Sequence, residues 1–138
     1  MPTRLPANYR PSDKEPFMNA RQREYFRRKL LAWKGELLMG TSETLRHLQT
    51  ETVQEPDIAD RATAETDRAV ELRTRDRERK LIAKIDEALK RIADGTYGYC
   101  EETGEPIGLK RLEARPIATL SVEAQERHER IERTFREE

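Results

Sequence analysis

EPDIADRA, residues 55–62, separates two long stretches whose apolar residues recur at helical spacing. The first stripe consists of Phe26, Leu30, Trp33 and Leu37. The second stripe consists of Ile82, Ile85, Leu89 and Ile92. Because a short turn joins stripes of equal length, they can bury each other only by folding back antiparallel. The sequence therefore predicts a coiled-coil hairpin, on the order of 45 Å long at about 1.5 Å per helical residue.

Capping signals place this hairpin at residues 19–94. Asn19 offers an N-cap, and the Gln22 side chain can reach back toward it from three positions on. Gly95 follows Asp94 as a C-terminal stop for the second helix. The apolar pattern of the first helix also has a neighbouring stripe, made of Leu38, Leu45 and Leu48.

The middle of the hairpin is expected to be its weakest part. The run RTRDRERK, residues 73–80, contains no apolar residue. An antiparallel register places it opposite a stretch that contains Gly35 and Gly40. Each glycine costs about 1 kcal/mol relative to alanine inside a helix.

The segments on either side of the hairpin are irregular. Residues 1–18 hold four prolines and form an arm, while residues 95–138 are rich in turn residues. Leu109 and Leu112 indicate one helical turn, and Ser121 can cap a last helix. Its sparse apolar positions are Val122, Ile131 and Phe135. Since residues 95–138 are too few to bury a core alone, the arm and the hairpin base should pack on them.

The predicted fold class is therefore mainly α. It combines a long antiparallel coiled-coil hairpin, whose tip lies at residues 55–62, with a small globular domain. That domain contains a degenerate zinc-finger-like turn and a C-terminal helix.

Composition excludes several classes of protein. Only 35% of the 138 residues are apolar and 39% are charged, with a formal net charge of zero. The chain therefore lacks the bulk positive charge of non-specific DNA binding. We see no membrane span and no signal core, so we expect a cytoplasmic protein. A single cysteine, Cys100, excludes an internal disulfide.

The stretch YGYCEETGEPIG, residues 97–108, keeps the tight turn of a zinc knuckle without its ligands. The four positions of a CxxC…CxxC frame are Cys100, Thr103, Ser121 and Ala124. One thiolate and two hydroxyls cannot form a structural zinc site. We therefore predict no metal, with hydrogen bonds from Thr103 and Ser121 holding the turn. Two further potential ligands are interpreted as ordinary surface or seam residues: His47 and His128.

The charged run 73–80 has two interpretations. It can be a solvated helix face with internal pairs such as Asp76 with Lys80. Alternatively it is a docking stripe, because Arg73, Arg77 and Lys80 share one face and arginine forks onto carboxylates of a partner. Both interpretations remain open at this point.

The carboxylates of the tip also have two interpretations. Asp57 after Pro56 is a suitable N-cap, and Asp60 in a first helical turn is favoured by the helix dipole. The functional alternative is that a narrow arm delivers both carboxylates to a Mg²⁺ ion, a metal-bound phosphate or an arginine elsewhere.

Five blocks of the sequence carry a resemblance to a known family: FRRKLLAWKGEL, PDIADRA, ELRTRDRERKLIAKI, YGYC and IGLKRLEARP. From about Glu15 to Arg130 the chain resembles the DksA family of bacterial transcription factors. Members insert a coiled-coil hairpin into the secondary channel of RNA polymerase. With Cys100 as its single cysteine, the chain is similar to the cysteine-poor, zinc-independent branch.

The resemblance implies roles for individual residues. The family's tip motif, D-x-x-D-x-A, falls on Asp57, Asp60 and Ala62. The family's stem arginines, which lie against the channel rim, match Arg73 and Arg77. The alarmone ppGpp, bound at the polymerase interface, would be held by Lys84 and Arg115. A third basic position of the family is Gln125 here, which is expected to weaken that site.

The implied function is non-enzymatic regulation of RNA polymerase. The tip would modulate promoter open complexes together with ppGpp, as in the stringent response, with no cofactor and no sequence-specific DNA binding. We expect a monomer, because the hairpin buries its seam within one chain. Two alternatives remain open: a transcript-cleavage factor acting through the same channel, and a helical adaptor that dimerises.

Overall fold

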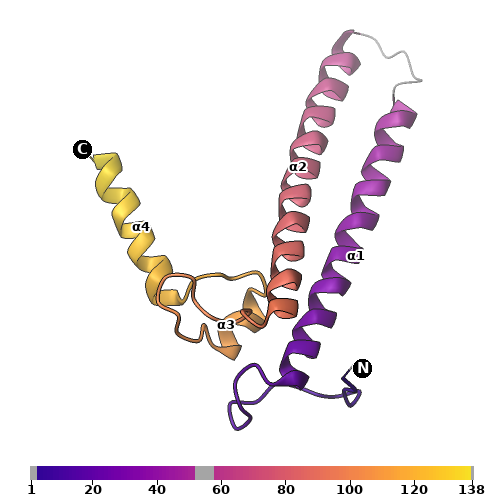
Figure 1. Ribbon diagram of the computed structural model, residues 1–138. Helices are drawn as coiled ribbons and strands as arrows, with labels where there is room; N and C mark the ends of the chain where they lie inside the picture. Colours follow the sequence, from indigo (N-terminus) through magenta and orange to yellow (C-terminus); the bar gives the residue numbers. More distant parts are fainter. Residues whose placement is uncertain (1–2, 52–57, 138) are drawn as a thin grey trace. The chain divides into compact units, whose positions relative to one another are not determined.

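The computed structural model describes the backbone of residues 3–51 and 58–137 and the side chains of residues 3–40 and 61–136. Its helices are α1 (Ala20–Glu51), α2 (Ile58–Asp94), α3 (Leu109–Ala114) and α4 (Val122–Glu137), shown in Figure 1. The mainly helical fold class is therefore confirmed. Within the described residues, no helix is both long enough and apolar enough to cross a membrane.

The chain divides into two compact units. The first unit combines Met1–Leu30 with Glu87–Glu138, and the second is Leu31–Asp86. The unit boundaries thus cross α1 and α2 rather than following the ends of the predicted hairpin. The N-terminal part of α1 and the C-terminal part of α2 belong to the first unit, which is discontinuous in sequence as expected.

The start of α1 is fixed by a network of side-chain hydrogen bonds. The Asn19 carbonyl oxygen Oδ1 accepts a bond of 2.9 Å from the Gln22 backbone N–H, so Asn19 is the predicted N-cap. The Gln22 side chain does reach back, but to the Met18 N–H at 2.8 Å rather than to Asn19. Its amide also donates to the Ser12 carbonyl at 3.2 Å. Gln22 is fully buried and joins the arm to the helix.

The buried part of the predicted seam lies toward the hairpin base. Phe26, Leu30 and Ile85 are fully buried, and Ile92 is 8% exposed. The other predicted seam residues are half-buried: Trp33, Leu37, Ile82 and Leu89. Leu38 is 49% exposed, so its assignment to a second stripe was wrong. The side chains of Leu45 and Leu48 lie outside the described residues.

Within the second unit, α1 and α2 run side by side and antiparallel (Figure 1). Lys34 Nζ contacts Asp86 Oδ1 at 2.7 Å, and a Cβ built on Gly40 would lie 4.0 Å from Glu78 Oε1. Residues 73–80 therefore lie opposite Gly40. Gly35, next to Lys34, lies opposite residues that follow this run. No side chain is buried among the described residues 31–40 and 61–84. Such sparse burial supports the expectation of a weak middle.

Aromatic rings join the arm to the globular part of the first unit. Phe17 packs edge-on against Tyr99 at 5.5 Å between centroids, and Tyr9 packs against Tyr25 at 6.2 Å. Tyr97 is buried, and its hydroxyl donates to the Pro116 carbonyl at 2.8 Å. Phe17 of the arm and Phe26 of α1, which lies 5.7 Å from Tyr97 between ring centroids, thus add to the core of the short segment after α2.

The ends of the later helices follow their sequence signals. Gly95 follows α2 with φ +80°, a left-handed conformation that favours glycine. The hydroxyl of Ser121 accepts from the Ala124 N–H at 3.2 Å and caps α4. Leu109 and Leu112 are the buried residues of α3. The apolar side chains of α4 that were expected to be sparse are also exposed: Val122, Ile131 and Phe135.

Gly98 provides a test of how the arm packs. It has φ +93°, and a Cβ at this position would lie 2.9 Å from Met18 Cγ. We expect Gly98→Ala to lower the free energy of unfolding by about 1–3 kcal/mol, from left-handed strain and overlap with Met18. Urea unfolding of the two proteins measures this difference.

The matched control is Gly104→Ala, because Gly104 has φ +74° but open space around it. This control carries the backbone strain without the overlap, so it should lose less stability. Equal losses in the two variants would contradict the packing of Met18 against Gly98.

Candidate functional site

One face of α2, in the second unit, carries a continuous basic stripe. Arg73, Arg77, Lys80 and Lys84 follow one another at steps of four, three and four, and all are exposed. None of the ion pairs between described residues involves these four side chains. Two of them, Arg73 and Arg77, are the predicted stem residues. The stripe is therefore open to carboxylates of a partner, since exposed guanidinium groups can bind them with two parallel hydrogen bonds.

Two acidic residues near the stripe, Asp76 and Asp86, pair with other cations. Asp76 pairs with Arg79, one turn along α2, and not with Lys80 as the sequence suggested. Asp86 pairs with Lys34 of α1 at 2.7 Å. On a helix, a carboxylate can reach a cation either three or four positions along the chain, so spacing alone does not decide between Arg79 and Lys80 as the partner of Asp76. The pairing with Arg79 leaves Lys80 on the basic stripe.

The tip lies largely outside the described residues. Asp57 is not described, and for Asp60 only the backbone is, in the first turn of α2. Ala62 is described and exposed. The roles of the two carboxylates therefore remain predictions.

The two residues expected to hold ppGpp belong to different units. Lys84 is an exposed residue of α2 in the second unit. Arg115 is exposed in the first unit, where it ends α3 and its N–H donates to the Arg111 carbonyl at 2.7 Å. Gln125, on α4, donates to Glu129 at 3.4 Å. A joint site of Lys84 and Arg115 remains a prediction.

The knuckle, defined as residues 97–108, is closed by backbone hydrogen bonds. The Cys100 N–H donates to the Glu105 carbonyl at 2.8 Å, and the Gly104 N–H donates to the Cys100 carbonyl at 2.9 Å. The Ile107 N–H donates to the Gly98 carbonyl at 2.8 Å. The turn thus has its backbone groups paired without any metal ligand.

The thiol of Cys100 is held by hydrogen-bond donors. Burial raises its pKa, but donors from the Ser121 backbone, the Thr103 hydroxyl and N–H, and the Glu102 N–H outweigh this effect and lower the pKa to about 6. Cys100 is 3% exposed. The donors stabilise a thiolate where a zinc knuckle would place a metal.

The other three positions of the CxxC…CxxC frame do not fit zinc. The hydroxyl of Thr103 accepts from the Glu105 N–H at 3.2 Å, and that of Ser121 caps α4. Ala124 is fully buried and offers a methyl group. Tetrahedral zinc needs four thiolate, imidazole or carboxylate ligands. In the part of the chain that the structure describes, no cluster of three His, Cys, Asp or Glu residues could replace them.

Sequence reasoning missed a contact of His128, which it treated as an ordinary surface or seam residue. Its side chain pairs with Glu102 of the knuckle, and both are partly exposed. The contact links α4 to the loop that follows Cys100. No spacing signal marks it, because the two residues are far apart in sequence. The side chain of His47 lies outside the described residues.

Two family models match successive parts of the chain. Residues 22–92 match the family described as DnaK suppressor protein DksA, N-terminal domain. Residues 95–130 match the family described as prokaryotic dksA/traR C4-type zinc finger. The second match covers the knuckle, although the donor set described above departs from four cysteines.

Curated relatives and a solved structure cover more of the chain. A protein of Caulobacter vibrioides (strain NA1000 / CB15N), named RNA polymerase-binding transcription factor DksA, is 70% identical over 132 residues, 96% of this chain and 93% of its own length. The protein of that name from Escherichia coli (strain K12) is 46% identical over 115 residues, 83% of this chain and 76% of its own. The structure of transcription factor DksA2 from Pseudomonas aeruginosa is 47% identical, with a TM-score of 0.78 over 85% of this chain and 90% of that one. On these matches and the helical hairpin described above, the chain belongs to the DksA family.

Proposed function

We propose that this protein is a non-catalytic regulator of RNA polymerase. The observation that carries the proposal is its 70% identity, over 96% of the chain, to a relative named for binding RNA polymerase. The antiparallel helices and the exposed basic stripe support it, because both suit insertion of the hairpin into a channel with an acidic rim. Such a protein would act in the cytoplasm, as a monomer, without sequence-specific contacts to DNA.

In this proposal the hairpin enters the secondary channel and carries its tip toward the catalytic centre. Asp57 and Asp60 would place negative charge there, beside Ala62. The protein performs no reaction, so its effect comes from binding one promoter complex more tightly than another. A tip that favours the closed complex lowers the stability of the open complex.

In this proposal the stem arginines Arg73 and Arg77 supply much of the affinity for polymerase. Arg73 and Arg77 are exposed on one face of α2, and arginine binds carboxylates in a bidentate geometry that lysine cannot match. Within the proposal these side chains lie on the channel rim. Binding through the stem and regulation through the tip are then separate properties of one hairpin.

The effector in this proposal is ppGpp, held between the protein and polymerase by Lys84 and Arg115. A coupling free energy of about 1–3 kcal/mol corresponds to about a 5- to 150-fold effect on affinity. Gln125 lacks the charge of a basic residue, so we expect coupling toward the lower end of that range.

The tip is tested by Asp60→Asn, with Asp67→Asn as matched control. Asp67 is an exposed carboxylate of the same helix, farther from the tip. We expect Asp60→Asn to lose inhibition of a ribosomal-type promoter while polymerase affinity changes by less than about tenfold, or 1.4 kcal/mol. Purified transcription and binding assays measure the two properties.

Full inhibition by Asp60→Asn would refute the account of the tip. Backtracked complexes distinguish the enzymatic alternative, since a transcript-cleavage factor would shorten the RNA and a regulator would not. Sedimentation distinguishes the adaptor, because a tight dimer of the isolated protein would favour it.

The effector site is tested by neutralising Lys84 and Arg115. We expect Lys84→Gln and Arg115→Gln each to raise the ppGpp concentration for half-maximal enhancement of inhibition about tenfold, the loss typical of one charge-assisted contact. Inhibition without ppGpp should stay at its original level. Transcription assays across a ppGpp titration measure both quantities.

The matched controls for this test are Lys90→Gln on α2 and Lys110→Gln on α3, which also remove exposed lysines. Gln125→Lys should increase the ppGpp response. A loss of response in the controls equal to that of Lys84→Gln would show a general charge effect instead of a site.

The absence of zinc is tested by metal analysis of protein purified without chelators. Because the donor set of Cys100, Thr103, Ser121 and Ala124 does not fit zinc, we expect well below one equivalent. A chelator should also leave the melting temperature unchanged. One equivalent of zinc, or melting at lower temperature with the chelator, would overturn this expectation.

A further inference from the structure

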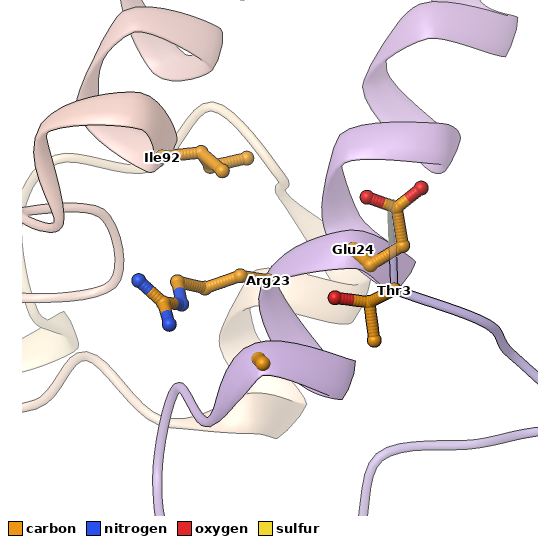
Figure 2. Close-up of a pocket in the computed structure, with 5 residues that line it drawn as sticks. Thr3, Arg23, Glu24 and Ile92 are labelled. Atoms are coloured by element: carbon orange, nitrogen blue, oxygen red, sulfur yellow. The ribbon is translucent and has the colours of Figure 1, made fainter. Parts of the chain in front are cut away.

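A small cavity lies in the first unit, and none of its lining residues belongs to the tip, the basic stripe or the proposed ppGpp site. It has a volume of about 150 Å³ and is lined by Thr3 of the arm, Ala20, Arg23 and Glu24 of α1, and Ile92 of α2. In Figure 2, Arg23 extends to one side, while Thr3 and Glu24 lie on the other. Polar and apolar side chains therefore share the lining of the cavity.

The residue that points to a ligand is Arg23, whose side chain has no hydrogen-bond or ion-pair partner among the described residues. Its Nε is buried and has no hydrogen-bond partner. Among the described residues no hydrogen bond or ion pair involves its side chain, whereas Arg27 and Arg28 of the same helix are both paired. A buried donor without an acceptor is unfavourable. The arrangement suits a ligand that supplies the missing acceptor.

Glu24 cannot be that acceptor. Its Oε2 accepts from Arg27 Nε at 2.9 Å, and its Oε1 accepts from Arg28 Nε at 2.9 Å. The hydrogen bond from Arg27 is the main reason why the pKa of Glu24 lies below its ordinary value, so the carboxylate is charged, and its hydrogen bonds among the described residues go to Arg27 and Arg28. Its negative charge is outweighed by the two arginines that hold it.

The surroundings of the cavity favour an anion. Arg23 and Glu24 line the cavity, and Arg27 and Arg28 both pair with Glu24, so three cations accompany one carboxylate there. The hydroxyl of Thr3 adds a second possible donor, since no hydrogen bond of the described residues uses it. An excess of positive charge beside an unpaired guanidinium attracts an oxyanion.

We propose that this cavity binds a phosphate-type oxyanion. A phosphate group carries a charge of about −1.5 to −2 at pH 7 and several acceptor oxygens, so it matches an excess of cationic side chains better than a carboxylate does. Its oxygens can accept from the Arg23 guanidinium and from the Thr3 hydroxyl, since both residues line the cavity. The phosphate belongs to inorganic phosphate or to a short phosphate chain.

The test uses nuclear magnetic resonance of the full chain, with inorganic phosphate and pyrophosphate as probes at constant ionic strength. The proposal expects saturable shifts of the Arg23 side-chain N–H and of the Ile92 methyl groups. Saturation by inorganic phosphate alone identifies the free anion, and tighter binding of pyrophosphate identifies a phosphate chain. Chloride and acetate are the comparison anions.

Arg23→Gln should weaken phosphate binding by tenfold or more. The matched control is Arg21→Gln, which removes the same charge from an exposed neighbour that does not line the cavity. Because Arg23 has no partner, Arg23→Gln should melt no lower than the original protein, and phosphate should raise the melting temperature of the original protein alone.

Three results would overturn the proposal: shifts that never saturate, equal weakening by Arg21→Gln, or equal saturation by acetate. The last result would identify a carboxylate, as on an acidic partner protein, as the occupant. None of these outcomes bears on polymerase regulation, since the cavity shares no residue with the tip, the basic stripe or the proposed ppGpp site.

Discussion

The structure depends on the packing of α1 against α2 through a narrow apolar stripe on each helix. A stripe of this kind buries few side chains and leaves most of each helix surface to solvent. The fully buried members, including Phe26, Leu30 and Ile85, lie toward the base, where the arm and the segment after α2 add further contacts. Beyond them, the described residues 31–40 and 61–84 contain no buried side chain. In that part of the hairpin, the ion pair of Lys34 with Asp86 joins the two helices.

The narrowness of the apolar stripe also explains the charge distribution on α2. Because one face is enough for the seam, the rest of the helix is free to carry charge, and its exposed basic stripe has no acidic partner within the described chain. Asp76 and Asp86 pair with Arg79 and Lys34 instead. A partner with acidic groups can therefore meet the stripe without first breaking internal pairs, which would weaken binding.

The knuckle is a zinc-finger-like turn whose donor set does not fit zinc. Backbone hydrogen bonds close the loop, and N–H and hydroxyl donors surround Cys100 where a zinc knuckle would place the ion. The lowered pKa of Cys100 follows from those donors, since they favour the thiolate over the thiol. Because Ala124 fills its position with a buried methyl group, packing replaces coordination there.

Local signals in the sequence were enough to predict the helices. Asn19, Gly95 and Ser121 each act through their own backbone or the next turn, so their effect can be derived without the fold. Contacts between distant residues could not be derived in this way. The pairing of His128 with Glu102 and the exposure of Leu38 depend on how elements pack, which spacing along one helix does not determine.

The cavity beside Arg23 was missed for the same reason. Arg23 is one of several arginines at the start of α1, and the sequence does not distinguish it from Arg27 or Arg28. Only the structure separates them, because Glu24 engages those two and leaves Arg23 without a partner. Tip chemistry, in contrast, rests on Asp57 and Asp60, whose side chains lie outside the described residues.

The most direct measurement of the central claim is photo-crosslinking from the tip. A photoreactive amino acid at the exposed position of Ala62 should label the catalytic subunits of RNA polymerase next to the active centre. The same group at Glu132, an exposed residue of α4, should not label that region. Labelling from Ala62 alone is the predicted result. Failure of Ala62 to label the catalytic subunits, in complexes that bind and inhibit normally, would contradict the account.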